Sequence, residues 1–125
     1  MKRVVNTIKA PQAIGPYSQA IVNGNTVFTS GQIYLTSDGK KVGETIEEQT
    51  HQVMKNLMAI LESAGVSFKD VVKTVIYITD MSVFGKMNEV YKSYMVEPYP
   101  ARETVGVKEL PLGAKVEISM VAVKN

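Results

Sequence analysis

The run AKVEISMVAV, at positions 114–123, constrains the fold more than any other part of the chain. Successive side chains of a β-strand point to opposite faces of its sheet. One face of this run carries Val116, Ile118, Met120 and Ala122. The other face carries Lys115, Glu117, Ser119, Val121 and Val123, and it is therefore partly apolar too. The pattern predicts a strand over 114–123 that is buried on both sides.

Other segments have the composition of strands and of the turns that join them. Asn23-Gly24 stands between two apolar runs, which is typical of a tight hairpin. Gly31 is expected at a bulge or at a point of close approach, because glycine inside a strand weakens it. A β-branched run and a run that follows a proline favour two more strands. Strands are thus predicted near 19–22, 26–34, 70–80 and 102–107, with an ordered loop at 10–18.

The segment 45–64 has the clearest helical pattern. Thr45 followed by Glu48 makes a capping box, which satisfies the free amide groups at the start of a helix. Gly65 supplies the stop at its end. The residues that recur at helical spacing are Ile46, Thr50, Val53, Met54, Leu57, Leu61 and Ala64.

A second helix is predicted to begin at Ser82, a capping residue, and to end before Pro98 and Pro100. Its inner face is expected to carry Phe84, Met87, Val90 or Tyr91, and Tyr94. The order of elements is then ββαβαββ, without internal repeats. This order predicts an α+β fold in a single domain over 1–125, with one mixed β-sheet and two helices packed on one of its faces.

Helices on one face leave the other face of the sheet open. That open face is expected to be apolar and to include Thr29, Gly31, Ile33, Val75, Tyr77, Val121 and Val123. Because an exposed apolar face of this kind usually marks an interface, the pattern predicts self-association.

Composition argues against several classes of function. The 14 basic and 12 acidic residues are scattered and leave a net charge of +2, so no basic patch for nucleic acid is indicated. Cysteine is absent and His51, the only histidine, is expected at the helix surface, which leaves no zinc site and no activated nucleophile. No phosphate-loop or dinucleotide-binding motif is present. Neither a signal-peptide core nor a membrane span is indicated, which favours a cytoplasmic protein with no membrane partner.

Two charged residues stand in strand-like surroundings, where a charge is unfavourable unless it has a partner or a function. Arg102 ends the stretch YPAR, and Glu117 lies within the alternating run 114–123. A guanidinium group binds a carboxylate through two parallel hydrogen bonds. A glutamate held partly out of water can exchange protons near neutral pH. The two residues could therefore pair with each other, face solvent, or lie at opposite ends of a binding site for a small acid.

Four fragments together carry a resemblance to a known family. GPYSQA (15–20), FTSGQI (28–33), YPAR (99–102) and VEI (116–118) resemble the RidA (YjgF) family of reactive-intermediate deaminases. The fragments occur in the same order and at similar spacing over nearly the whole chain. The resemblance implies a chorismate-mutase-like fold and a homotrimer with three clefts between subunits.

The resemblance also implies roles for particular residues of the cleft. Arg102 is expected to bind the carboxylate of the substrate, and Glu117 to activate water. The other implied contacts are Tyr17, Ser30, Gly31, Asn88 and Thr104. Thr104 stands where many members have a cysteine, on the side of its strand that carries Arg102, whereas Glu103 points to the opposite side. No reaction here can therefore depend on a thiol.

Three of these positions also have purely structural explanations. Tyr17 could be a loop aromatic that packs on the sheet, and this is about as plausible as contact with substrate. The Ser30 hydroxyl could bond to the backbone. Asn88 could be an exposed polar residue of its helix.

The implied reaction is hydrolytic deamination of 2-enamines and 2-imines, such as 2-aminoacrylate, to 2-keto acids and ammonia. No cofactor or metal is needed, because the imine is already electrophilic, and the expected ligand is a small 2-imino or 2-keto acid. An alternative is a non-catalytic trimer that binds 2-keto acids or regulates another protein; it would use Arg102 but not Glu117. Ribonuclease activity, reported for relatives, is disfavoured by the sparse positive charge and the lone histidine.

Overall fold

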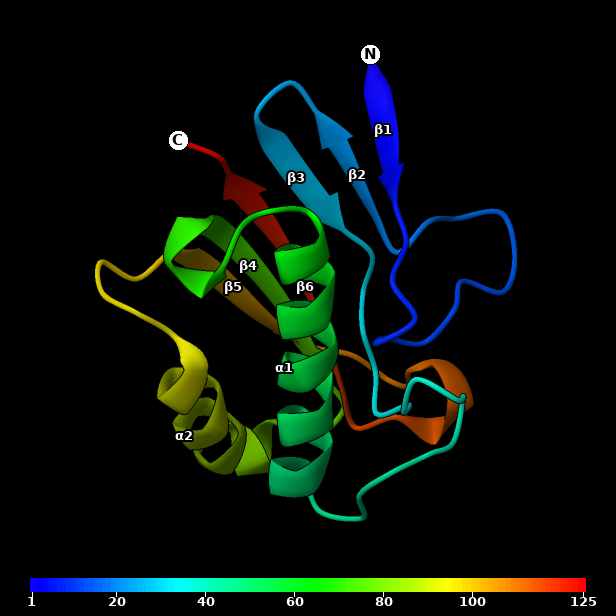
Figure 1. Ribbon diagram of the computed structural model, residues 1–125. Helices are drawn as coiled ribbons and strands as arrows, with labels where there is room; N and C mark the ends of the chain where they lie inside the picture. Colours follow the sequence, from blue (N-terminus) through cyan, green and yellow to red (C-terminus); the bar gives the residue numbers. More distant parts are fainter.

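Residues 1–125 form one mixed, six-stranded sheet with the strand order β1-β2-β3-β6-β4-β5, shown in the computed structural model of Figure 1. The strands are β1 (Lys2–Val5), β2 (Ala20–Asn23), β3 (Thr26–Thr29), β4 (Val71–Ile78), β5 (Ala101–Gly106) and β6 (Val116–Val123). β4 and β5 are parallel, and all other neighbours are antiparallel. The helices are α1 (Ile46–Ser63) and α2 (Phe84–Tyr94). The predicted α+β fold and order of elements are confirmed, and β1 adds a strand that the sequence pattern did not indicate.

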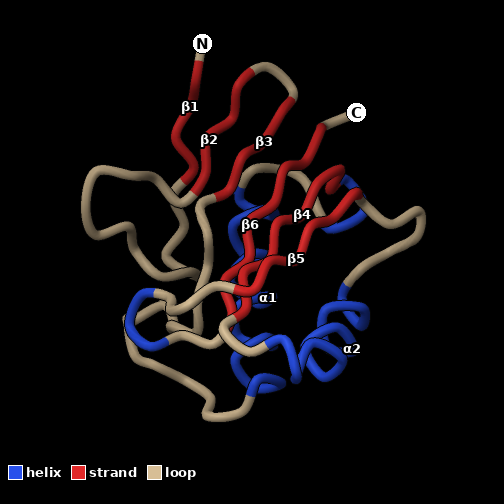
Figure 2. The backbone as a smooth tube through the Cα atoms, turned by 180° about the vertical axis from the view of Figure 1, so that it is seen from behind, coloured by secondary structure: helices blue, strands red, loops and turns tan.

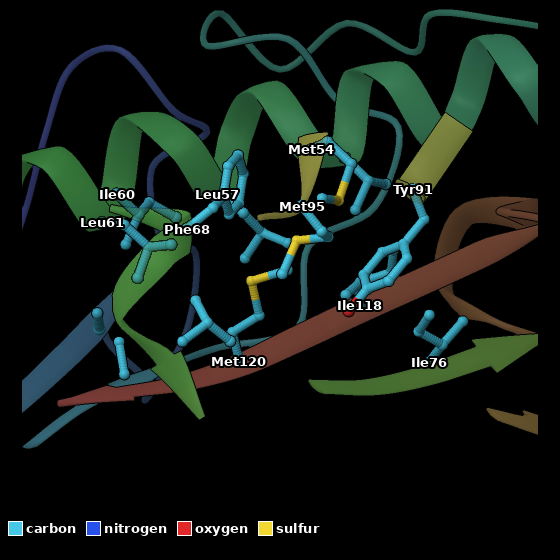
Figure 3. Close-up of a cluster of buried hydrophobic side chains, with 14 of the residues drawn as sticks. Met54, Leu57, Ile60, Leu61, Phe68, Ile76, Tyr91, Met95, Ile118 and Met120 are labelled. Carbon is cyan, nitrogen blue, oxygen red and sulfur yellow. The ribbon is translucent and has the colours of Figure 1, made fainter. Parts of the chain in front are cut away.

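Both helices cover the same face of the sheet, and Figure 2 shows the opposite face with neither α1 nor α2 in front of the strands. The register of β4 on β6 pairs Ile76 with Ile118 on the covered face and Tyr77 with Glu117 on the open face. Between α1 and the sheet lies the core (Figure 3), whose fully buried members include Met54, Leu57, Ile60, Leu61, Ile118 and Met120. Neither helix is long and apolar enough to cross a membrane.

Local sequence sets the start of α1 and the hairpin between β2 and β3. The Thr45 hydroxyl accepts a hydrogen bond from the Glu48 amide, and the Glu48 carboxylate accepts one from the Thr45 amide, both at 3.1 Å. The predicted capping box is therefore confirmed. The hairpin is confirmed as well, with Gly24 at a φ of +61° and Asn23 paired with Thr26, so Gly24 and Asn25 form its tip.

The start of α2 differs from the prediction. Ser82 does not cap the helix but lies inside a short 3₁₀ turn, Met81–Val83. The Asp80 carboxylate caps this turn by accepting a hydrogen bond from the Ser82 amide at 2.9 Å, and α2 begins only at Phe84. Asp80, two residues before Ser82, is therefore the capping residue. The 3₁₀ turn precedes α2, so the first free amide groups lie near Asp80 rather than near Ser82.

The end of β3 also differs from the prediction. The strand ends at Thr29 rather than at position 34, because its pairing with β6 stops where Phe28 lies opposite Val121. Beyond that point only isolated bridges form, from Gln32 to Ile118 of β6 and from Leu35 to Lys41. Residues 30–35 are therefore free to turn away from the strand and to line a cavity.

The open face of the sheet is largely apolar. The predicted members Val75, Tyr77, Val121 and Val123 lie on it and are half-buried. The register corrects one member: Phe28, 48% exposed, lies there instead of Thr29. Thr29 lies opposite the buried Ala20, and its hydroxyl accepts a hydrogen bond from the Met120 amide at 2.9 Å.

Candidate functional site

Glu117 lies on the open face of the sheet without a charged partner. Its side chain is half-buried, and it forms no ion pair within the chain. Burial without compensation raises the pKa of the Glu117 carboxyl above the ordinary value of a glutamate. The group can therefore hold a proton at a higher pH than an exposed glutamate, which is the property that proton exchange near neutrality requires.

Gly31 gives the Glu117 carboxylate the room that it occupies. A Cβ added at position 31 would lie 2.7 Å from Glu117 Oε2 and 2.8 Å from its carboxyl carbon, closer than such atoms approach. The close approach predicted at Gly31 is thus confirmed, and the group that approaches is the carboxylate. A glycine is needed here for space rather than for backbone conformation.

A cavity of about 630 Å³ borders this carboxylate. Four of the positions implied by the family resemblance line it, namely Tyr17, Ser30, Gly31 and Glu117. The Ser30 hydroxyl donates a hydrogen bond to the Ser18 carbonyl, and the Tyr17 hydroxyl accepts one from the Ile14 amide at 3.3 Å. The Ser30 hydroxyl therefore bonds to the backbone, as the structural alternative predicted, and Ser30 also lines the cavity. Much of the remaining wall is apolar and includes Ile14, Ile33, Leu35 and Leu112.

Two buried amide side chains hold the loops around this cavity. Gln19, 2% exposed, bonds both backbone polar atoms of Thr7, at 2.7 and 3.0 Å. Asn56, 1% exposed, donates to the carbonyl oxygens of Ile33 at 3.2 Å and Leu35 at 2.8 Å. Sequence reasoning missed both roles. The signal for Gln19 was its place in GPYSQA, and Asn56 was a polar residue beside the apolar stripe of its helix.

Arg102 lies on the helix-covered side of the sheet. It belongs to the edge strand β5, where it pairs with the buried Thr74. Its guanidinium donates to Asn88 Oδ1 at 2.6 Å, and the guanidinium carbon lies 5.2 Å from the ring centre of Tyr91 and 5.5 Å from that of Phe84. Aromatic faces attract a cation, and the bond to Asn88 fixes its direction. The remaining N–H groups can then bind an anion, and the two rings, predicted only as core residues, help to hold the guanidinium.

A second cavity, of about 410 Å³, borders this guanidinium. Its lining residues are Asn88, Tyr91, Lys92, Tyr99, Pro100 and Arg102. Thr104 lies outside this cavity but on the same side of β5, because it pairs with Ile76 on the covered face. Its hydroxyl oxygen is buried without a hydrogen-bond partner. Glu103 points to the open face, as strand alternation predicts, and forms an ion pair with Lys73 at 2.7 Å.

Arg102 and Glu117 therefore do not meet within one chain. Their register partners lie on opposite faces of the sheet, and each residue lines a separate cavity. The possibility that they pair with each other is excluded within the chain, whose ion pairs are Lys40–Asp38 and Lys73–Glu103. No group of three His, Asp or Glu side chains lies together in a way that could hold a metal ion.

The two carboxyl groups of the open face should respond to pH with opposite signs. Burial raises the pKa of Glu117, so ionisation destabilises the folded chain as the pH rises through that raised value. The hydrogen bond and the charge of Lys73 lower the pKa of Glu103. The ionised Glu103 therefore stabilises the folded chain at a pH above the pKa that this group has in the unfolded chain, and this stabilisation is lost as the pH falls through the lowered value.

We therefore expect Glu117→Gln to raise Tm relative to wild type at neutral pH, and the gain to vanish in acid. Glu103→Gln, the matched control, should instead lower Tm at neutral pH and match wild type in acid. Thermal unfolding of the three proteins across this pH range checks the pair. A gain for Glu117→Gln that persists unchanged in acid would contradict the assigned burial effect.

The fold and the cavities beside Glu117 and Arg102 define a small α+β protein with room for small molecules, since cavities of this size are typical of ligand sites. The family model described as Endoribonuclease L-PSP matches residues 7–124. A RutC family protein of Aquifex aeolicus is 50% identical over 124 residues, covering 98% of this chain and 99% of the relative. A mouse protein named 2-iminobutanoate/2-iminopropanoate deaminase is 45% identical over 126 residues, covering 100% of this chain and 93% of the relative.

Solved structures agree with these relatives. A crystal structure from Thermotoga maritima is 52% identical, has a TM-score of 0.97, and covers 100% of this chain and 99% of its own. That of E. coli TdcF with bound serine is 37% identical, has a TM-score of 0.92, and covers 98% and 99%. The chain belongs to the RidA/YjgF family, in which several relatives are named as imine deaminases.

Proposed function

We propose that the protein hydrolyses 2-enamine and 2-imine acids, such as 2-aminoacrylate, to 2-keto acids and ammonia. The observation that carries the proposal is the Glu117 carboxyl, which is half-buried, free of ion pairs and placed on the wall of a cavity. An unpaired, partly buried carboxyl costs stability and is therefore expected where a function needs it. The relatives named as 2-iminobutanoate/2-iminopropanoate deaminases support the reaction class.

The active site is proposed to form between copies of the chain, in the homotrimer that the family resemblance implies. Arg102 and Glu117 lie on opposite faces of one sheet, so a three- or four-carbon acid cannot touch both in a single chain. A second copy packed on the apolar open face could bring its Arg102 to the Glu117 cavity. The exposed Phe28 ring on that face supports such packing, because large exposed apolar surfaces usually mark interfaces.

The chemistry divides between the two residues. Arg102 binds the carboxylate of the substrate and so orients its imine carbon. An enamine such as 2-aminoacrylate tautomerises to the imine first. Glu117 takes a proton from water as the water oxygen bonds to the imine carbon, and it passes this proton to the imine nitrogen, which gives a carbinolamine. The proton of the carbinolamine hydroxyl then moves to nitrogen as the C–N bond breaks, so ammonia leaves and the carbonyl of the 2-keto acid forms.

A coupled assay tests the proposal. Purified protein is added to a pyridoxal-phosphate dehydratase that releases 2-aminoacrylate from serine, and the appearance of pyruvate is followed. We expect faster pyruvate formation than with heat-denatured protein. Equal rates would reject the enzymatic proposal. RNA degradation is measured in parallel, because the description of the matching family model contains the word endoribonuclease.

Gly31→Ala should impair the reaction without unfolding the protein. The new Cβ would overlap the Glu117 carboxylate, which must then rotate out of its place. We expect kcat/KM in the coupled assay to fall by about tenfold or more, since small misplacements of a reacting group have effects of this order.

Gly85→Ala is the matched control, because a Cβ at Gly85 in α2 meets nothing within 4 Å. It should leave kcat/KM unchanged. A Gly31→Ala protein that is as active as the Gly85→Ala protein would contradict the proposed contact between position 31 and the reacting carboxylate.

A non-catalytic protein that binds 2-keto acids is the second candidate. It is favoured by the way Arg102 is held, between two aromatic rings and Asn88, which suits an anion anchor whether or not a reaction follows. The TdcF structure with bound serine shows a relative that holds a small amino acid. The two candidates differ in whether Glu117 is needed.

A further inference from the structure

The cavity beside Arg102 contains two cationic side chains and no acidic one. Besides Arg102 it is lined by Lys92, on the last turn of α2, together with the Asn88 amide, Tyr91, Tyr99 and Pro100. Lys92 forms no ion pair, although Glu89 lies one turn earlier on the same helix. The walls of this cavity therefore carry an uncompensated positive charge from two residues.

Lys73, Lys86 and Lys115 differ from Lys92 because each has an acidic neighbour. Lys73 is paired with Glu103 on the open face. Lys86 and Lys115 border a third cavity, of about 360 Å³, but Glu47 and Asp80 line that cavity too. Of these three cavities, only the one beside Arg102 is lined by two cationic side chains and no acidic one.

The helix sets the spacing between the two cations. Asn88 and Lys92 are four residues apart on α2, so their side chains are neighbours on one face, roughly 6 Å apart along the axis. Arg102 is bonded to Asn88 at 2.6 Å. Lys92 therefore lies one helical turn beyond Asn88, the residue that holds the Arg102 guanidinium, and its side chain lines the same cavity.

We infer that the site accepts 2-imino acids whose side chain ends in a second carboxylate. The inference rests on the proposed function. Arg102 binds the carboxylate next to the imine, the imine carbon faces Glu117 of a neighbouring copy, and the side chain runs along α2 so that its terminal carboxylate meets Lys92. An acid with an apolar side chain would leave the Lys92 charge unpaired. The substrate class is then the imines related to 2-keto dicarboxylic acids, in addition to the smaller monocarboxylic ones.

Two product-like ligands of equal chain length test the inference by titration calorimetry. 2-Oxoglutarate has the terminal carboxylate, and 2-oxopentanoate has a methyl group in its place. We expect wild-type protein to bind 2-oxoglutarate about fivefold more tightly at low salt, near the upper end of what an exposed ion pair contributes. The preference should fall as salt is added.

Variants locate the source of the preference. Lys92→Gln should abolish it and Lys92→Glu should reverse it, whereas Lys86→Gln, a lysine of the same helix outside this cavity, should keep it. Equal binding of the two ligands by wild type, or a preference that survives Lys92→Gln, overturns the inference. Either result together with normal hydrolysis of 2-aminoacrylate leaves the proposed function standing. A Lys92-dependent preference without any hydrolysis instead rejects the enzyme and keeps the binding site.

Discussion

We expect Glu117→Gln to lower the rate of the proposed imine hydrolysis by roughly 10²–10⁴-fold, the contribution of one positioned acid or base. Glutamine has nearly the same shape and can still form hydrogen bonds, but it cannot take a proton from water or return one to nitrogen. The loss should therefore appear in kcat of the coupled pyruvate assay. Binding of 2-oxobutanoate, measured by calorimetry, should be retained, because the carboxylate anchor Arg102 is untouched.

Glu103→Gln provides the matched control for this prediction. Glu103 is an acid on the same face of the sheet, but it is exposed, it is paired with Lys73, and it lines neither the cavity of Glu117 nor that of Arg102. Its variant should retain turnover. Full turnover by Glu117→Gln would remove the carboxyl from the mechanism, and the non-catalytic binding protein would then be the better description.

Mixing two inactive variants should restore activity. Arg102→Ala lacks the anchor and Glu117→Gln lacks the acid, so neither variant alone can form a complete site in the proposed homotrimer. In a mixed trimer, an intact Glu117 of one copy can face an intact Arg102 of the next. After joint unfolding and refolding of equal amounts, we expect about a quarter of wild-type activity, because random assembly completes about one site in four.

A second mixture shows whether each site is shared. Wild type refolded with the Arg102→Ala/Glu117→Gln double variant should also have about a quarter of wild-type activity if two copies form each site, and about half if one copy is enough. Equal activity of the two mixtures is therefore the signature of a shared site. An inactive first mixture beside a half-active second one would place the whole site within a single chain.

The parts of the fold that depend on local sequence were predictable. The alternation over 116–123 correctly separated the covered face from the face of Glu117, because strand geometry fixes which side each residue takes. The capping box at Thr45 correctly marked the start of α1. β1 was missed, because its residues KRVV are mostly exposed and its place depends on pairing with β2 far along the chain. The shift of the α2 cap to Asp80 depends on the extra 3₁₀ turn.

The candidate site was predictable only in part. The resemblance named positions that do line the cavity of Glu117, and strand alternation placed Thr104 beside Arg102. The sequence could not show that Arg102 and Glu117 lie on opposite faces of the sheet, because their positions depend on the register of β5 on β4 and of β6 on β4. Nor could it show the aromatic rings around Arg102. Tyr91 and Phe84 have the spacing of core residues, and only the packing of α2 against the edge strand reveals their second role.

If each active site is shared between copies, as proposed, the position of Arg102 and Glu117 on opposite faces of one sheet has a consequence in the cell. A newly made polypeptide would carry both halves of the reaction machinery yet be chemically silent, since neither half can act on a metabolite alone. Catalytic output would then rise more steeply than protein amount at low expression and become proportional only once encounters between copies are frequent.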